Sequence, residues 1–204
     1  LFPIGSMSKE EVRDYAYKKG LPNHDKPDST GICFIGERPF KNFIQKFLPP
    51  KPGKIITEDG EILGKHDGLM YFTLGQRKDI GIGGLKNHSG DPWYVANKDI
   101  DRNELLVVQG RKHKKLWQKK AFAKEMNWLN ESFLESIQKK GSIACKAKCR
   151  YRQEDANCEI TLHEDGVKVH FEEAQWAITH GQYIVIYEQD VCMGGGKIFP
   201  HSEL

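Results

Sequence analysis

The chain has 204 residues, of which 38% are hydrophobic and 10% aromatic, so it is long enough to bury one or two cores. No apolar run approaches the length of a bilayer span and no signal-peptide pattern opens the chain, which argues against a membrane or secreted protein and predicts a cytoplasmic one. The formal net charge of +3 is too small to indicate nucleic-acid binding by itself.

The first segment predicts a short helix followed by a loop. Ser8 and Glu11 have the spacing of a capping box, and Gly20 follows two lysines where the helix should end. Residues 21–31 are rich in proline, aspartate and glycine, which is typical of irregular loops. Cys33 lies at the far end of this loop, so its thiol is either a mobile nucleophile or, as for most free cysteines, buried packing.

The cysteines as a set argue against two classes of site. There are five, an odd number, and none has Cys-x-x-Cys spacing. This pattern is unlike a secreted disulfide scaffold and unlike a zinc ribbon, so no metal site is predicted.

The middle of the chain predicts a small β-rich unit. Residues 39–47 have the apolar spacing of an amphipathic helix that a proline-rich segment ends. Asp59-Gly60 is a hairpin signal between two apolar segments, and two further strands are predicted within residues 93–108. Residues 37–109 are therefore predicted to form a central β-rich domain.

The C-terminal half predicts an antiparallel β-barrel. Short β-patterned segments recur with turn residues between them over residues 121–199. In residues 143–152 apolar and cationic residues alternate, so the two-residue period of a strand directs Cys145 and Cys149 to the core and the cations to solvent. Cys158 likewise falls on an apolar face. The predicted class is mainly β with short helices.

Charge is segregated along the second half of the chain. Residues 105–124 and 136–153 contain cations but no acid, and the acids concentrate in residues 154–173. Such segregation is typical of a phosphate-facing surface and also of a solvated lysine-rich face. The charge pattern leaves both interpretations open.

Five motifs resemble, in order, those of the tRNA-specific 2-thiouridylase family. They are Asp28-Ser29-Thr30-Gly31-Ile32-Cys33-Phe34-Ile35-Gly36, Gly68-Leu69-Met70-Tyr71-Phe72-Thr73-Leu74-Gly75-Gln76-Arg77-Lys78, Pro92-Trp93-Tyr94-Val95, Arg150-Tyr151-Arg152-Gln153 and Cys192-Met193-Gly194-Gly195-Gly196. The motifs extend over nearly the whole chain, which makes the resemblance specific.

The resemblance implies three segments and an incomplete enzyme. Residues 1–36 would be the end of an α/β catalytic domain with the cysteine loop, residues 37–109 the central domain and residues 110–204 the barrel. Members of the family bind ATP in an N-terminal pyrophosphatase-type domain, whose Ser-Gly-Gly-x-Asp-Ser loop does not occur here. The glycine-rich run at residues 75–84 lacks the Walker ending as well. The fragment is therefore expected to be inactive alone.

The resemblance also implies a chemistry for Cys33. The family transfers sulfur to C2 of the wobble uridine of certain tRNAs after ATP has activated the carbonyl oxygen. Cys33 matches the cysteine that carries the persulfide, which is loaded by a sulfur-donor protein, either a cysteine desulfurase or a sulfur-relay protein. A second catalytic cysteine, which would form a disulfide with Cys33, has no counterpart in this chain.

For tRNA contact, the resemblance points to Arg150, Tyr151 and Gln182. Arg150 belongs to the predicted basic strand, which suits phosphate contact. Strand alternation would direct Tyr151 to the core, so only the resemblance assigns it to RNA. The competing hypothesis is a noncatalytic RNA-binding barrel in which Cys33 is packing.

Overall fold

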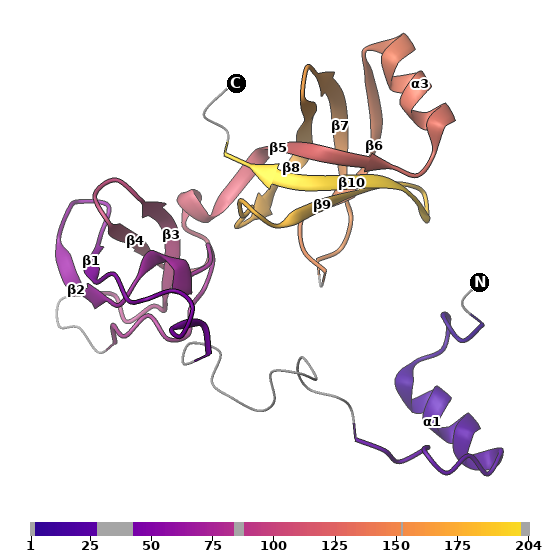
Figure 1. The fold of residues 1–204 in the computed structure, drawn as a ribbon, viewed down its shortest axis with the longest axis horizontal. Helices are drawn as coiled ribbons and strands as arrows, with labels where there is room; N and C mark the ends of the chain where they lie inside the picture. The colour runs from indigo at the N-terminus through magenta and orange to yellow at the C-terminus, as the bar shows by residue number, and fades with distance from the viewer. Residues whose placement is uncertain (1–2, 28–42, 84–87, 152, 201–204) are drawn as a thin grey trace. The chain divides into compact units, whose positions relative to one another are not determined.

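The computed structural model describes residues 3–27, 43–83, 88–151 and 153–200 (Figure 1). The chain divides into two compact units, Leu1–Pro49 and Pro50–Leu204, and each is described by itself. Within the described ranges, no helix combines the length and the apolar character needed to cross a membrane. The predicted boundaries after residues 36 and 109 stay a prediction.

The first unit contains helix α1 (Lys9–Lys18), which begins and ends as its sequence predicts. The Glu11 amide donates to Ser8 Oγ at 3.3 Å, and the Ser8 amide donates to Glu11 Oε2 at 2.6 Å, which completes the capping box. Gly20 follows the helix with a φ of 68°, a left-handed conformation that suits glycine. Residues 39–42 of the second predicted helix lie outside the described residues.

The second unit consists mainly of strands, with short helices between them; η marks a 3-10 helix. Its elements are β1 (Gly53–Ile56), β2 (Ile62–His66), η1 (Leu69–Tyr71), β3 (Trp93–Asp99), β4 (Glu104–Gln109), η2 (Lys114–Leu116), β5 (Trp117–Trp128), α3 (Glu131–Lys140), β6 (Ser142–Lys148), β7 (Ala156–His163), β8 (Gly166–Trp176), β9 (Tyr183–Glu188) and β10 (Val191–Phe199). The predicted mainly β class is confirmed.

The central sheet has four strands in the order β2-β1-β4-β3. Strands β1 and β2 form the predicted hairpin, with Gly60 at a φ of 83° in its turn, and β3 pairs antiparallel with β4. Strand β1 pairs parallel with β4, so the sheet is mixed. Its core is built on Ile55, Val95, Leu105 and Val107, which are fully buried.

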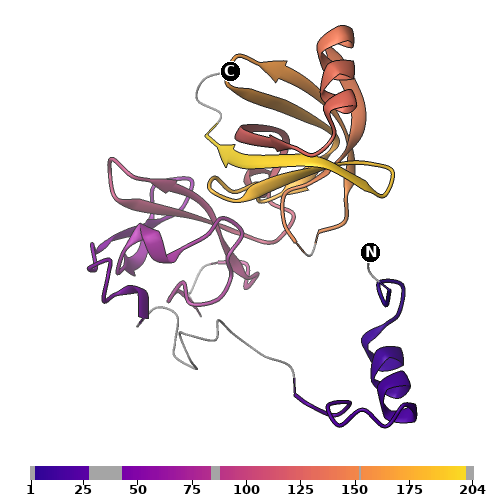
Figure 2. The same cartoon turned by 45° about the vertical axis from the view of Figure 1, so that its right-hand side comes forward.

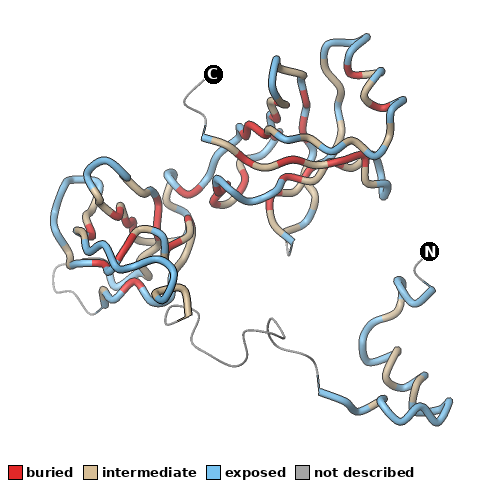
Figure 3. The backbone as a smooth tube through the Cα atoms, viewed as in Figure 1, coloured by how far each residue is buried: buried red, intermediate tan, exposed pale blue. Residues whose placement is uncertain are grey.

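The C-terminal strands close into a barrel in the order β10-β5-β8-β7-β6-β9, and every neighbouring pair is antiparallel (Figure 2). Closure leaves no edge strand, because β9 pairs with both β6 and β10. Phe171, Ile160, Ile184 and Ile186 fill the interior and are fully buried, and Figure 3 shows such buried stretches along the barrel strands. The predicted antiparallel barrel is confirmed.

Helix α3 is an element that the sequence-based interpretation missed. Asn130 caps its first turn by accepting the Phe133 amide at 2.9 Å, and Gly141 ends it with a φ of 79°. Phe133 and Ile137, four residues apart, are buried in the barrel core, and the helix packs against β6 and β7. Both caps and the apolar spacing are readable in the sequence, so the signal was present.

The glycine motif near the C-terminus is explained by barrel closure. A side chain at Gly194 would place its Cβ 2.5 Å from the Asn127 carbonyl oxygen, and one at Gly196 would place it 2.6 Å from the Lys124 carbonyl oxygen. Both contacts are with the backbone of β5, which cannot move aside as a side-chain tip can. The motif therefore lets β10 approach β5 closely and seal the barrel.

Candidate functional site

Cys33, the predicted persulfide carrier, lies outside the described residues, so its role stays a prediction. Two of the other thiols occupy the core, as the strand alternation predicted: Cys149 and Cys158 are both buried. Burial raises the pKa of the Cys149 thiol to about 12, which keeps it protonated at neutral pH. Cys149 therefore lacks the thiolate that a nucleophile needs.

Arg150 is the best-anchored of the predicted site residues. It lies beyond the end of β6, and its Nη2 atom donates to the carbonyl oxygen of Leu74 at 2.7 Å and to that of Ala177 at 2.9 Å. The same atom donates to the hydroxyl of Thr179 at 3.0 Å. One guanidinium thus joins the turn after β6 to the segment that follows β8 and to residues 68–78, the motif that contains Leu74.

The prediction of a solvent-facing ladder of cations is wrong at Arg150. Strand β6 ends at Lys148, so the two-residue alternation no longer applies at position 150. Lys146 is exposed, with its Nζ 3.1 Å from a carboxylate oxygen of Asp155, and the Nζ of Lys148 lies 5.0 Å from the ring centre of Tyr187. The two lysines follow the predicted outward direction, whereas the arginine turns back into the protein.

The charge of Arg150 is held by neutral groups. Desolvation lowers the pKa of its guanidinium. Because the ordinary pKa of arginine is very high, the group still stays charged at neutral pH. Its three acceptors are two carbonyls and a hydroxyl, and none of the described carboxylates forms an ion pair with it. Its Nε is buried without a hydrogen-bond partner among the described residues. The positive charge is therefore uncompensated, which suits attraction of an anion.

Gln182 is fixed close to Arg150 by a tight turn. Thr179, whose hydroxyl accepts from Arg150, also accepts the Gln182 amide at its carbonyl oxygen, at 3.2 Å. The amide of Ile198 in turn donates to the Gln182 carbonyl at 2.7 Å, which ties the turn to β10. Gln182 is exposed, so its side chain remains available for contact. The fold brings Arg150 and Gln182 together although they are far apart in sequence.

Tyr151 points into solvent and not into the core. It is 94% exposed, in a turn closed by the Gln153 amide donating to the Arg150 carbonyl at 3.1 Å. The core position that strand alternation favours for Tyr151 is wrong, because the strand has already ended.

Tyr183, which directly follows Gln182, is 62% exposed and was missed by the sequence-based interpretation. An aromatic residue beside the Gly181-Gln182 turn is the signal that would have identified it. The exposed rings can stack on unpaired bases.

A groove beside this turn has the opposite charge. It measures about 560 Å³, and its lining includes Trp117, Trp176 and the carboxylates of Glu154, Glu172 and Glu173. A polyanion would be repelled from these carboxylates. The groove therefore limits the surface that could bind nucleic acid on this side of the turn.

Several cations of the first basic window are engaged with other groups of the protein. Lys124 Nζ lies 2.6 Å from a carboxylate oxygen of Asp165, and Lys115 Nζ lies 3.4 Å from one of Glu58. Lys119 Nζ donates to a backbone carbonyl at 2.7 Å. These contacts favour the solvated-face interpretation for these three lysines. Among the described residues, no three His, Cys, Asp or Glu side chains are grouped so as to hold a metal ion.

Three family models match consecutive parts of the chain. The model described as the tRNA methyl transferase HUP domain matches residues 1–37. The tRNA methyl transferase PRC-barrel domain matches residues 41–109, and the aminomethyltransferase beta-barrel domain matches residues 118–198. The last of these ranges contains strands β6 to β9 and both turns of the candidate site.

Curated relatives match nearly the whole chain. A tRNA-specific 2-thiouridylase MnmA of Pseudoalteromonas translucida is 52% identical over 97% of this chain and 53% of its own length. Proteins of the same name from Psychromonas ingrahamii and Methylobacillus flagellatus are 50% and 49% identical, over 100% and 97% of this chain and 54% of their own lengths. The chain thus spans about half the length of the curated relatives it matches.

Proposed function

This chain belongs to the tRNA-specific 2-thiouridylase (MnmA) family, and we propose that it is the part of a tRNA uridine 2-sulfurtransferase that carries the sulfur-bearing thiol and part of the tRNA-contacting surface. The observation that supports this most strongly is the 52% identity to a 2-thiouridylase over 97% of the chain. The family models that match residues 1–37 and 118–198 cover both the segment around Cys33 and the barrel turns that hold Arg150, Tyr151 and Gln182.

In this proposal Cys33 is the persulfide carrier. A donor protein, a cysteine desulfurase or a sulfur-relay protein, transfers a sulfur atom to its thiolate. The terminal sulfur then attacks C2 of the wobble uridine, the new carbon–sulfur bond forms, and the activated oxygen leaves with its adenylate. A second catalytic cysteine, which has no counterpart in this chain, would attack the Cys33 sulfur, so that the bond between Cys33 and the transferred sulfur breaks, 2-thiouridine is released and a disulfide with Cys33 forms for later reduction. The reaction is proposed to take place in the cytoplasm.

ATP would supply the activation of the uracil oxygen, and the start of the glycine-rich run at residues 75–84 does not fit a phosphate loop. The glycine-rich run is the natural candidate for a phosphate loop, yet the Gly75 amide donates to the Val95 carbonyl at 2.7 Å and the Gln76 amide to the Thr73 carbonyl at 3.0 Å. A Cβ at Gly75 would lie 2.7 Å from the Cβ of Ala177, so this glycine serves close packing. These amides are not free to bind phosphate, and we assign no ATP contact to them.

For tRNA, we assign distinct roles to the three residues of the candidate site. Arg150 supplies a positive charge that no described carboxylate compensates. Tyr151, almost fully exposed, would stack on an unpaired base, and Gln182 would donate to a base or phosphate from its fixed turn. Arg150 also holds the two turns together through Thr179.

The sulfur-transfer role is tested with a Cys33→Ser variant of the intact enzyme in cells that lack their own 2-thiouridylase. Nucleoside mass spectrometry of total tRNA should show 2-thiouridine falling to background, because serine cannot carry a persulfide. A Cys192→Ser variant is the matched control: this thiol is half-buried, and its contact with a backbone carbonyl, at 4.0 Å, is so long that its loss should cost little. Full thiolation by the Cys33→Ser variant would exclude the proposed role.

The tRNA contact is tested by measuring affinity at several salt concentrations. Loss of one phosphate contact should reduce the slope of log affinity against log salt by about 0.7–0.9, so Arg150→Ala is expected to weaken binding and flatten the slope by that amount. Tyr151→Ala should weaken binding with no change of slope. Lys139→Ala removes an exposed charge of α3 and serves as the control. An Arg150→Ala variant with an unchanged slope would rule out phosphate contact by this residue.

A further inference from the structure

Cys145 and Cys158 form a close pair of thiols for which the sulfur-transfer chemistry has no use. They are register partners on the antiparallel strands β6 and β7, and their sulfur atoms lie 3.7 Å apart. The two residues are only 13 positions apart in the chain. Direct register places both side chains on the same face of the barrel wall.

The backbone geometry at this pair suits a covalent link. Facing residues of antiparallel strands have Cα atoms about 4.5 or 5.5 Å apart, and both values fall within the range of about 4.4–6.8 Å that disulfides span. A disulfide bond needs its sulfur atoms at about 2.05 Å, which rotation of the side chains can reach without moving the strands. The structure therefore holds the two thiols ready to be joined.

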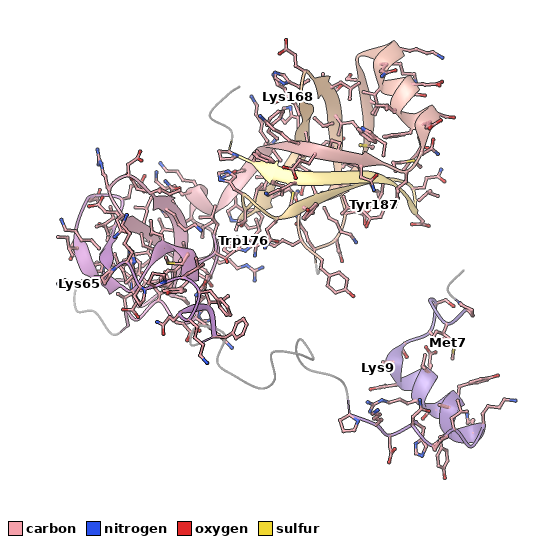
Figure 4. The ribbon with its side chains drawn as sticks, in the orientation of Figure 1. Met7, Lys9, Lys65, Lys168, Trp176 and Tyr187 are labelled. Atoms are coloured by element: carbon pink, nitrogen blue, oxygen red, sulfur yellow. The ribbon has the colours of Figure 1, made fainter. Side chains whose placement is uncertain are left out.

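One of the two thiols is open to a small reagent. Cys145 is half-buried, whereas Cys158 is buried. The ladder between β6 and β9 begins at Lys146, so Cys145 lies just beyond its end. A hollow of about 420 Å³ includes both cysteines in its lining, with Tyr187, labelled in Figure 4, and Glu188 on its β9 side.

The two thiols also differ in acidity. A pair that is oxidised stepwise needs one thiol with a lowered pKa, which reacts first as the thiolate. The hydrogen bond with Cys158 lowers the pKa of Cys145, because the Cys158 thiol can donate to the Cys145 thiolate. The same interaction and burial raise the pKa of Cys158 well above its usual value. Cys145 would thus be the thiolate that reacts first, and Cys158 the thiol that follows.

We propose that Cys145 and Cys158 are an oxidative modification site, a cross-strand dithiol that a peroxide converts reversibly into a disulfide. The Cys145 thiolate attacks one peroxide oxygen, the O–O bond breaks, and a sulfenic acid forms as the other oxygen leaves as hydroxide or alkoxide. The Cys158 sulfur then displaces the sulfenic oxygen, which leaves as water. Two thiols lose two electrons and two protons, and the peroxide is reduced to water or to water and an alcohol. An external dithiol reverses the step and is oxidised to its own disulfide.

The test uses the full-length protein with Cys33→Ser, so that the sulfur-carrying thiol does not compete. Hydrogen peroxide is added to the folded protein at neutral pH, free thiols are alkylated, and the protein is digested with trypsin without a reductant. Trypsin separates the thiols, because Cys145 falls in peptide 141–146 and Cys158 in peptide 153–168, whereas Cys149 falls in 149–150. We expect peptides 141–146 and 153–168 to appear joined, two hydrogens lighter than their sum, and alkylation of Cys145 to fall about tenfold and recover with dithiothreitol.

Two variants and one condition make the test specific. Cys145→Ser should abolish the joined peptides, and since this residue is half-buried the variant is expected to fold. Cys192→Ser, which alters the other half-buried thiol, should leave them unchanged. Joined peptides that form only in urea would overturn the proposal, because the native register would then not be their cause. Oxidation of Cys145 to a sulfinic acid without joining to Cys158 would overturn it equally.

Discussion

The barrel and the central sheet solve the problem of strand edges differently. The barrel pairs every strand on both sides, whereas the sheet ends in the edge strands β2 and β3. Buried groups differ as well: the barrel buries thiols and, on β8, the neutral side chain of Gln175, while the sheet buries a titratable imidazole, that of His66, which is 3% exposed. Closure lets the barrel hold the turns of the candidate site on a rigid frame. The sheet region contributes a single carbonyl to that site, that of Leu74.

The largest effect is expected from emptying the barrel core. Phe171→Ala should lower the free energy of unfolding by about 3–5 kcal/mol, because it removes a fully buried ring and leaves a cavity in a closed frame. Chemical denaturation followed by far-ultraviolet circular dichroism measures the change. A decrease in the free energy of unfolding below about 1 kcal/mol would mean that the barrel closes around the cavity and is therefore not a rigid frame.

Arg150→Ala should have the next largest effect, because it removes hydrogen bonds that join the two regions in addition to the packing of Trp176 and Ala177 against the core of the sheet. The carbonyls of Leu74 and Ala177 lose a charged donor, which is expected to cost about 1–3 kcal/mol. Sheet and barrel should then unfold in separate steps, visible as two transitions in a calorimetric scan. Arg150→Lys keeps the charge but cannot reproduce the geometry of the guanidinium, so it should recover only part of the loss. A single unchanged transition in the alanine variant would contradict the linking role.

The pH dependence of stability should have opposite signs on the acid and alkaline sides, because burial shifts the pKa values of His66 and Cys149 in opposite directions. Burial lowers the pKa of His66 below its ordinary 6.5, so the unfolded chain binds the proton first and stability should fall as the pH drops below that value. Burial raises the pKa of Cys149 from an ordinary 9.0 to about 12, so the unfolded chain loses its proton first and stability should fall between those two values.

Denaturation at several pH values checks this contrast. His66→Gln should flatten part of the acid side and leave the alkaline side unchanged, because burial lowers the pKa of His180 as well. Cys149→Ala should flatten part of the alkaline side only, because the pKa of Cys158 is also raised. If both variants flattened the same side of the profile, the assignment of the acid side to His66 and of the alkaline side to Cys149 would be wrong.

The smallest effect on stability is expected from Tyr151→Ala. The side chain is 94% exposed, so the free energy of unfolding should change by no more than about 0.5 kcal/mol. The same variant is expected to weaken tRNA binding. Tyr151 would then contribute to tRNA contact and not to the stability of the fold. A clear loss of stability would instead indicate that the ring packs on the barrel.

Local patterns were sufficient for much of the fold. The capping box of α1, the Asp59-Gly60 hairpin and the inward Cys158 of β7 were all predictable, because each depends on residues that are neighbours in sequence or alternate along one strand. Helix α3 shows that such a signal can be present and still be missed. Its Asn130 and Gly141 caps follow the same local rules.

The candidate site itself was decided by tertiary structure. The sequence indicated Arg150 as a solvent-facing cation, but its acceptors at Leu74 and Ala177 lie 76 and 27 positions away, beyond the reach of any local pattern. The same holds for the position of Gln182 beside it and for the exposure of Tyr151, which depends on where β6 ends. The sequence by itself determined the strand periods, turns and caps, since these follow from local backbone chemistry. Only the folded barrel decided which side chains meet, because closure brings together strands that are distant in the chain.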